Sequence, residues 1–340
     1  MKIVVDAMGG DHAPKSVIEG TIEALEYFYG FDVILVGNLD ELKPYIETYR
    51  LDKNPRIKLV HADQTVRMDE SSTVAIRQKK NSSITIAAGI VGDKKADALV
   101  TIGHTGAAMA ATTVRMRTLP GVERPAIAVV MPSTEGKFIL LDAGANVDCK
   151  ARNLAQFAVM GELYSKHVLA VKNPKIGLMS VGDEAIKGNE LTKEAFKILS
   201  GMPINFIGNV EGNDMFENKA DVVVCDGFVG NVILKSCEGL SKAIQFLLKK
   251  AFMKNPIRIT SAILGLKAFA ELKDVSDKET YGGAPLLGIN GICIIGHGSS
   301  SPKAVCNAIK IAADLVEKDL NGEILKRLKE SGIIVEKNNT

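Results

Sequence analysis

The N-terminal stretch VVDAMGGDHAPKSVIEG holds the first residues that could do chemistry. An apolar run ends at Asp6, and the pair Gly9-Gly10 is followed by Asp11 and His12. Glycine-rich turns before a helix can bind phosphate, because backbone N–H groups at the helix start attract anions. The two carboxylates would repel a phosphate unless cations lie close. We therefore interpret the glycines as permitting a tight turn and close approach, and the carboxylates as holding N–H groups or a cation such as Lys187.

Comparable polar or glycine-rich turns follow other apolar runs. They are TIGHTGAAMAA, LLDAGANVDCK, VGDEAIKGNELT, CDGFVGNVILKS and IIGHGSSSP. The residues that could bind phosphate or substrate in these turns are Gly9, Gly10, Asp11, His104, Thr105, Gly106, Asn146, His297 and Ser299. Helix capping explains some of them, but it explains the histidines and paired glycines poorly. Together the turns predict an anion-binding cleft, with phosphate on N–H donors, on Lys187, and on His12 or His297.

Several site motifs are absent from the sequence. There is no G-x-x-x-x-G-K-[ST], no G-x-G-x-x-G after the first strand, no H-E-x-x-H and no G-x-S-x-G. These absences argue against a P-loop nucleotidase, a dinucleotide enzyme, a zinc enzyme and a serine acyl-enzyme. We therefore expect neither a metal nor a cofactor.

Composition sets further bounds. At 340 residues, with 46% hydrophobic and 24% charged residues, the chain can bury a large core. The net charge of +2, the lack of Trp and an aromatic content of 5% give no support for nucleic-acid binding. The five cysteines form no C-x-x-C pair, and no export signal precedes the first strand, so we expect reduced thiols and a cytoplasmic protein. No apolar run reaches the ~20 residues that span a bilayer.

Short apolar runs alternate with helical patterns along the chain. The expected strands are KIVVD, DVILVG, IKLVH, ALVTIG, AIAVVM, FILLD, KIGLMSVG, INFIG, DVVVCDG and GICIIGHG. This alternation predicts a three-layer α/β fold with a largely parallel sheet. The carboxyl ends of parallel strands meet at one edge, so the polar turns should converge there. The stretch 241–274 differs: it reads as two helices that break near Asn255-Pro256, the second with a wide apolar arc.

At this point the motifs resemble a family. VDAMGGDHAP, VRMDESSTVAIRQKKNSSI, GHTGAAMA, LLDAGANVDC, IKGNELTKEA, CDGFVGNVILK and YGGAPLLGINGICIIGHGSS are similar to segments of the bacterial phosphate acyltransferases, the acyl-ACP:phosphate transacylases of phospholipid synthesis. The segments lie between residue 3 and about residue 301. One departure is His104, where the family pattern usually has Asn.

The resemblance implies a fold similar to isocitrate and isopropylmalate dehydrogenases, with residues 1–335 as one interwoven unit, and a homodimer. The polar residues after Val335 predict a frayed tail at 336–340. The resemblance also implies that acyl-ACP and inorganic phosphate give acyl phosphate, by direct attack of phosphate on the thioester. A membrane glycerol-3-phosphate acyltransferase would use the product. Lys187 and Asn231 match residues important for activity. The further catalytic candidates, whose family roles are less defined, are Asp6, His12 and Asp142.

The implied product carries a long hydrophobic acyl chain, so we expect the hairpin 241–274 to contact the inner face of the cell membrane. The alternative is that the hairpin forms a dimer interface, and the two roles can coexist. The contact candidates are Ile263, Leu264, Leu266 and Phe269. Acidic ACP would need a basic surface, for which the candidates are Arg115, Arg117, Arg124, Lys150, Arg152 and the hairpin lysines.

Three rival functions remain open. A phosphotransacetylase-like enzyme would use acyl-CoA in place of acyl-ACP. A β-decarboxylating dehydrogenase would need a metal-binding Asp set and a nicotinamide site, which the sequence does not supply. A membrane-surface scaffold would leave the polar turns unexplained.

Overall fold

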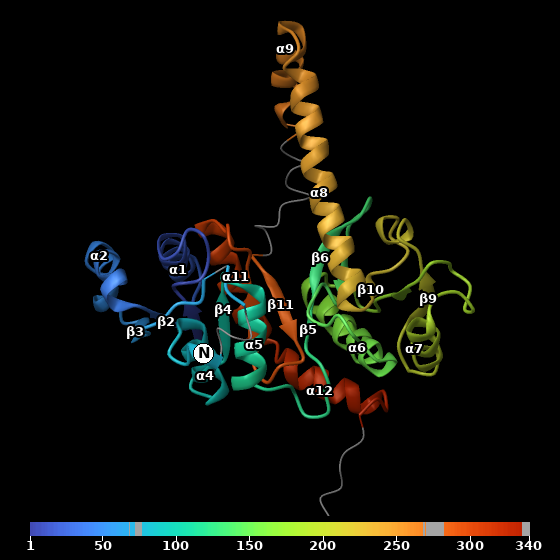
Figure 1. Cartoon of the computed structure of the whole chain (residues 1–340), viewed down its shortest axis with the longest axis horizontal. Helices are drawn as coiled ribbons and strands as arrows, with labels where there is room; N and C mark the ends of the chain where they lie inside the picture. Colours follow the sequence, from blue (N-terminus) through green and yellow to red (C-terminus); the bar gives the residue numbers. More distant parts are fainter. Residues whose placement is uncertain (68, 72–76, 268, 270–281, 335–340) are drawn as a thin grey trace, which may run out of the picture.

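A computed structural model of the chain describes residues 1–67, 69–71, 77–267, 269 and 282–334. Its described part contains two sheets that share one body, with one long helix projecting from it (Figure 1). The first sheet has seven strands in the order β3-β2-β1-β4-β12-β11-β5, and the second has five in the order β6-β7-β10-β8-β9. The predicted α/β architecture with mostly parallel strands is confirmed, but the strands are divided between two sheets.

The seven-stranded sheet is parallel from β3 to β12 and antiparallel at β11 and β5. Its strands are β1 (Lys2–Asp6), β2 (Asp32–Gly37), β3 (Ile57–His61), β4 (Ala98–Thr101), β5 (Ala126–Ile127), β11 (Ala284–Leu287) and β12 (Ile292–Ile295). The expected strand AIAVVM is divided: its start is β5 in this sheet and its end is β6 in the other. Strand β11 was not predicted, because its sequence APLL begins with a helix former and a proline.

The five-stranded sheet is parallel except at β6. Its strands are β6 (Val129–Pro132), β7 (Lys137–Leu141), β8 (Ile176–Met179), β9 (Phe206–Val210) and β10 (Val222–Val224). The chain passes from the first sheet to the second after β5 and returns with β11. Segments far apart in sequence therefore build each half.

Successive side chains of a strand point to opposite faces of its sheet, so one strand can contribute to the cores on both faces. In β1, Ile3 and Val5 join one core cluster and Val4 joins another. Helices α1 (Lys15–Tyr27) and α11 (Pro302–Glu317) cover the first face, and α4 (Ser83–Gly92) and α5 (Thr105–Arg115) cover the second. Helix α2 (Leu39–Tyr49) lies beside β3.

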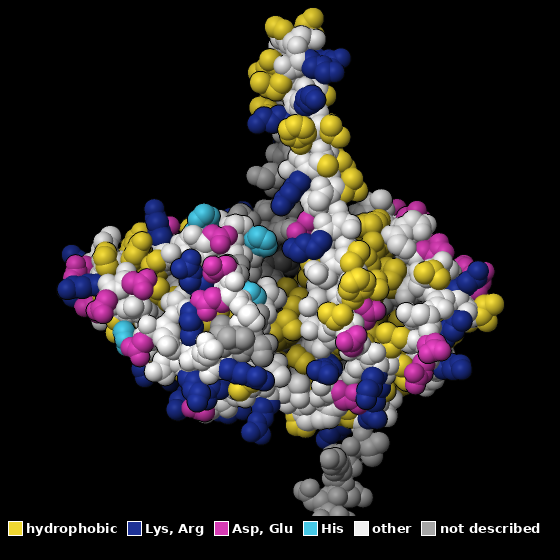
Figure 2. All heavy atoms as spheres, in the orientation of Figure 1, with side chains coloured by type: hydrophobic (Ala, Val, Ile, Leu, Met, Phe, Trp, Pro, Cys, Tyr) yellow, Lys and Arg dark blue, Asp and Glu magenta, His cyan; other side chains and the backbone are white. Residues whose placement is uncertain are grey.

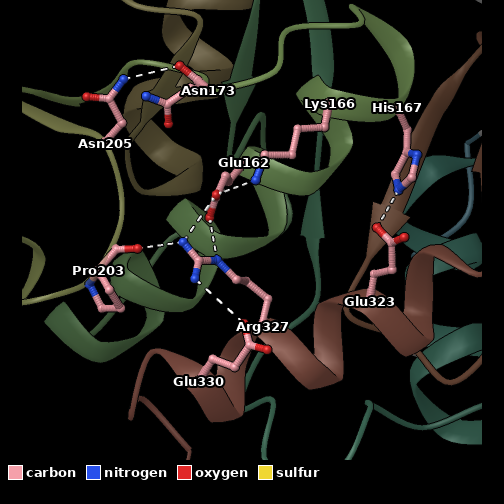
Figure 3. Close-up of polar contacts among 9 residues, drawn as sticks. All are labelled: Glu162, Lys166, His167, Asn173, Pro203, Asn205, Glu323, Arg327 and Glu330. Carbon is pink, nitrogen blue, oxygen red and sulfur yellow. Dashed lines mark hydrogen bonds and ion pairs between the residues drawn. The ribbon is translucent and has the colours of Figure 1, made fainter.

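The first core cluster continues beneath the second sheet, where α6 (Ala151–Val168) packs on β7 and β10. Helices α7 (Glu190–Ser200) and α12 (Leu320–Glu330) pack against α6. Figure 3 shows the polar join of α6 and α12: buried Glu162 accepts from Lys166 at 2.6 Å and from the Arg327 Nε at 3.0 Å, and the His167 ring lies 2.8 Å from Glu323. These contacts fix the C-terminal helix on the second half.

Helix α8 (Gly227–Phe252) leaves the body and carries α9 (Pro256–Leu264) at its far end (Figure 1). The predicted break near Asn255 is present, with the Asn255 side chain capping α9 through the Arg258 N–H at 3.0 Å. The predicted start at 241 was wrong, since the helix begins at Gly227 and runs without interruption from the site into the projection. Residues 268 and 270–274 of the expected hairpin lie outside the described residues.

Candidate active site

The carboxylate of Asp6 lies at the end of β1, directly opposite Thr101 of β4. It accepts hydrogen bonds from the Thr101 hydroxyl at 2.9 Å and from the Met8 N–H at 3.2 Å. Burial raises its pKa, and the hydrogen bonds from Ser83, Thr101 and Met8 oppose that rise. The register of two parallel strands thus places a buried acid at the sheet edge, held by donors and not by a lysine.

The loop after β1 is packed tightly against two other loops. A Cβ on Gly9 would lie 2.7 Å from the Gly103 nitrogen, so only glycine fits there. Gly10 has a φ of 104°, and the Asp11 N–H donates to the Gly298 carbonyl at 2.7 Å. The loops after β1, β4 and β12 are therefore one assembly.

His104 is the N-cap of α5, which runs from the loop after β4. Its Nδ1 accepts from the Gly106 N–H at 3.1 Å and the Ala107 N–H at 3.3 Å. An Asn side chain caps helices through its oxygen in the same way, so the ring nitrogen replaces the oxygen that the family resemblance leads one to expect. The ring lines a small pocket together with Asp6, Gly9, Thr65, Ser83, Thr101 and Gly103.

Five further predicted residues of this edge are exposed. They are Asp11, His12, Thr105, His297 and Ser299. The His297 Nδ1 lies 2.9 Å from the exposed Ser299 hydroxyl and also accepts from the Ser299 N–H at 3.3 Å. Exposed polar side chains thus follow the strand ends of the seven-stranded sheet.

Asp142 occupies the corresponding position at the end of β7, but its surroundings differ. It is fully buried and accepts from the backbone N–H groups of Ile127, Gly144, Ala145 and Asn146 and from the Asn146 amide, at 2.7–3.1 Å. Burial raises its pKa, and these donors oppose the rise. Because Ile127 belongs to β5, the carboxylate also ties one sheet to the other.

The start of α8 is seated on the Asp142 loop. A Cβ on Gly230 would meet the Asp142 carbonyl, and a Cβ on Gly227 would lie 2.8 Å from the carboxylate, so both positions need glycine. This contact brings the exposed Asn231 against Gly144. A Cβ on Gly144 would lie 3.4 Å from the Asn231 Cβ. The sequence signal for this arrangement is the glycine spacing in CDGFVGN.

Lys187 lies on the loop between β8 and α7, and its side chain is exposed. Two hydrogen bonds to the Glu184 carbonyl hold the loop. The Lys187 N–H and the Asn209 side-chain amide each donate to it at 2.9 Å. In the described part of the chain, no hydrogen bond or ion pair joins the Lys187 ammonium to Asp6 or Asp142. Its charge is therefore available to a ligand.

The structure thus groups the predicted residues in two sets, one at the strand ends of each sheet, and leaves Lys187 on a third loop. The surface is hollowed between the N-terminal part and the base of α8 (Figure 2). Sequence reasoning missed Ser83, Thr65 and Thr101, which line the Asp6 pocket. A threonine ending the apolar run ALVT was the one available signal, since its pairing with β1 is set by topology.

Two cysteines lie near the Asp142 loop. Burial raises the pKa of Cys149 to about 11 and that of Cys225 well above its usual value. Neither is a ready thiolate at neutral pH. Among the described residues, no group of three or more His, Cys, Asp or Glu side chains could hold a metal.

The residues predicted to contact a membrane or a partner lie on and beyond α9. Ile263, Leu264 and Leu266 are exposed, at 59%, 83% and 61%. Phe269 instead packs edge-on against Phe252 at 5.2 Å between ring centroids. No helix in the described part of the chain is both long and apolar enough to cross a membrane.

Comparison with known proteins shows where this architecture recurs. The chain is similar in fold to a phosphotransacetylase from Streptococcus pyogenes (TM-score 0.63, 16% identity, 94% of each chain covered) and to the EutD phosphotransacetylase from Staphylococcus aureus (TM-score 0.60, 16% identity, 93% and 94% covered). At such identities the likeness concerns the fold alone.

Sequence comparison is more specific. A family profile described as "Fatty acid synthesis protein" matches residues 1–322. The phosphate acyltransferase of Halothermothrix orenii is 46% identical over 334 residues, covering 98% of this chain and all of the relative. That of Nitratiruptor sp. is 47% identical over 331 residues, covering 97% and 98%. The chain therefore belongs to the phosphate acyltransferase family.

Proposed function

We propose that this protein transfers a fatty acyl group from acyl-ACP to inorganic phosphate and so supplies acyl phosphate for phospholipid synthesis. The observation that carries the proposal is the sequence identity of 46–47% with two phosphate acyltransferases over nearly the full length of the chain. The structure is consistent with it, because Lys187 and Asn231 are both exposed on loops or helix starts that follow strands of the five-stranded sheet.

The reaction is a direct displacement. An oxygen of hydrogen phosphate attacks the thioester carbonyl carbon, the C–S bond breaks, and the sulfur leaves with the proton that phosphate gives up. The products are acyl phosphate and the free ACP thiol. Phosphate is already a nucleophile at neutral pH, so the enzyme has only to orient the reactants, which is worth roughly 7–11 kcal/mol in well-aligned cases.

The candidate residues divide this work. Lys187 supplies the positive charge that phosphate needs, and Asn231 donates from its amide to phosphate or to the acyl carbonyl. Asp142 fixes the loop on which Asn231 rests. Asp6 and the glycine loop shape a pocket in the other half of the molecule, and His12 and His297 are exposed on the loops after β1 and β12.

The assay that tests this function is thiol release from palmitoyl-ACP, with and without phosphate, with hydroxylamine to trap acyl phosphate. Phosphate-dependent release with hydroxamate formation is the expected result. Release from an acyl-CoA but not from acyl-ACP would favour the phosphotransacetylase-like alternative. The absence of thiol release from both acyl-ACP and acyl-CoA would reject acyl transfer to phosphate.

We further propose that the projecting helices act at the inner membrane surface, at a homodimer interface, or at both. Hydrophobic side chains alternate with Lys and Arg along the projection (Figure 2). Burying one exposed Leu or Ile gains about 1.5–3 kcal/mol, and two copies in a dimer would strengthen a weak contact. Such a location would place the product near a membrane glycerol-3-phosphate acyltransferase.

Leu266→Glu separates these roles, with Thr260→Glu on the polar face of the same segment as its control. Loss of liposome co-sedimentation with an intact dimer supports the membrane contact. Loss of the dimer in size-exclusion chromatography supports the interface. Unchanged behaviour in both assays rejects the proposed role of this residue.

The docking surface for acidic ACP belongs to the same proposal. Arg115, Arg117, Arg124 and Lys150 are the stronger candidates, because Arg152 already pairs with Glu123 at 3.4 Å and donates to the Ile333 carbonyl. Charge reversal at a docking residue should weaken ACP binding more at low salt than at high salt.

A further inference from the structure

Helix α5 determines which nitrogen of His104 carries the proton. Two backbone N–H groups, of Gly106 and Ala107, donate to Nδ1. A nitrogen that accepts hydrogen bonds is unprotonated, so the proton of the neutral ring is on Nε2. A proton on Nδ1 would face both donors and the positive end of the helix. The cap therefore fixes the tautomer.

Among the described residues, the Nε2 hydrogen of His104 has no hydrogen-bond acceptor. In the described part of the chain no hydrogen bond joins Nε2 to another residue, and the carboxylate of Asp6 in the same pocket accepts from Thr101 and Met8 instead. The ring lines the pocket with Thr101 and Gly103. His104 thus offers one donor to whatever enters.

The pocket favours an uncharged oxygen over phosphate. The described residues that line it include the buried Asp6 and no Lys or Arg. A phosphate dianion beside that carboxylate would be repelled about twice as strongly as a single negative charge. A thioester carbonyl oxygen enters without charge and gains it only as the carbon is attacked.

We propose that His104 is a fixed neutral donor that binds the acyl carbonyl oxygen through Nε2–H, and that it is not a general acid or base. The proposal rests on the proposed acyl transfer. One preorganised donor aimed at an oxygen that gains charge in the transition state is worth about 10²–10³ in kcat.

Three substitutions separate the donor from the cap. Asn, Ser and Asp all cap helices, so His104→Asn, His104→Ser and His104→Asp should unfold at similar temperatures. Asn keeps a donor in its amide NH₂, Ser spends its short side chain on the cap, and Asp adds a negative charge. We expect kcat to fall within about tenfold for Asn, by about 10² for Ser and by more for Asp, with the KM for phosphate unchanged.

Equal kcat values for the Asn and Ser variants would overturn the proposal, as would a raised KM for phosphate with kcat unchanged. A readout independent of activity is ¹⁵N NMR of the five histidines, with His104→Asn identifying the signal that disappears. Nδ1 should show the shift of an unprotonated nitrogen and Nε2 that of a protonated one. The reverse pattern would reject the proposed tautomer. Inactive wild-type enzyme with the expected NMR pattern would instead reject the proposed function and leave the tautomer standing.

Discussion

Asp6 and Asp142 occupy equivalent places in the two halves of the molecule, yet the structure uses them differently. Asp6 is the last residue of β1 and Asp142 directly follows β7, and burial raises the pKa of each. Asp142 accepts five hydrogen bonds and has glycine backbone packed against it, so none of its surface is left for a substrate. Asp6 accepts fewer and lines a pocket.

The two strand-end edges present different residues. The edge of the five-stranded sheet is built around Asp142, and the candidate side chains there, Asn231 and Lys187, are exposed. At the edge of the seven-stranded sheet, the candidate side chains Asp6 and His104 line a pocket. We infer that the first edge binds phosphate and the second binds the acyl group.

The largest effect should come from Asp142→Ala. It leaves the N–H groups of Ile127, Ala145 and Asn146 without their acceptor, and each unsatisfied buried donor costs about 1–3 kcal/mol. The free energy of unfolding in urea should fall by at least about 3 kcal/mol. Asp148→Ala removes an exposed carboxylate from the same loop and should have little effect. An unfolding free energy equal to wild type would show that Asp142 does not hold the two sheets together.

Lys187→Ala should leave stability unchanged and reduce kcat/KM for phosphate by more than about tenfold, a loss of more than about 1.4 kcal/mol. The reason is that the exposed ammonium supports the ligand and not the fold. Lys193→Ala, an exposed lysine on α7, is the matched control. Near-normal turnover of Lys187→Ala would contradict the proposal that phosphate binds at this edge.

Asp6→Asn should sharpen the contrast through its pH dependence. A raised pKa in the folded state means that the carboxyl group favours folding below its ordinary pKa of 3.8 and loses that advantage as pH rises through the folded value. Wild type should therefore lose stability relative to Asp6→Asn between acidic and neutral pH, in urea unfolding at several pH values.

The control for Asp6→Asn is Asp11→Asn, which changes an exposed carboxylate of the same loop. A stability difference that stays constant with pH would contradict a burial effect at Asp6. Tighter phosphate binding by Asp6→Asn with undisturbed turnover would remove any orienting role from this carboxylate.

The sequence was a good guide to strands and strand ends and a poor guide to how they assemble. Apolar runs such as KIVVD and DVVVCDG specify buried strands by themselves, and the polar residues at and after their ends predict where the candidate site lies. Pairing is decided by distant segments: Asp6 meets Thr101 only because β4 lies beside β1. For the same reason neither the division into two sheets nor the cap role of His104 could be derived from spacing.

The smallest effect should come from Ser299→Ala, which tests whether the loop after β12 holds a nucleophile. The Ser299 hydroxyl lies 2.9 Å from the His297 ring, an arrangement that could activate a serine. Direct attack by phosphate needs no such group, so Ser299→Ala should keep kcat within about tenfold, the value of one neutral hydrogen bond. The complementary measurement is thiol release from acyl-ACP by wild type without phosphate. A burst equal to the enzyme concentration, together with an inactive Ser299→Ala, would establish an acyl-serine intermediate and move the nucleophile from the Lys187 edge to the Asp6 edge.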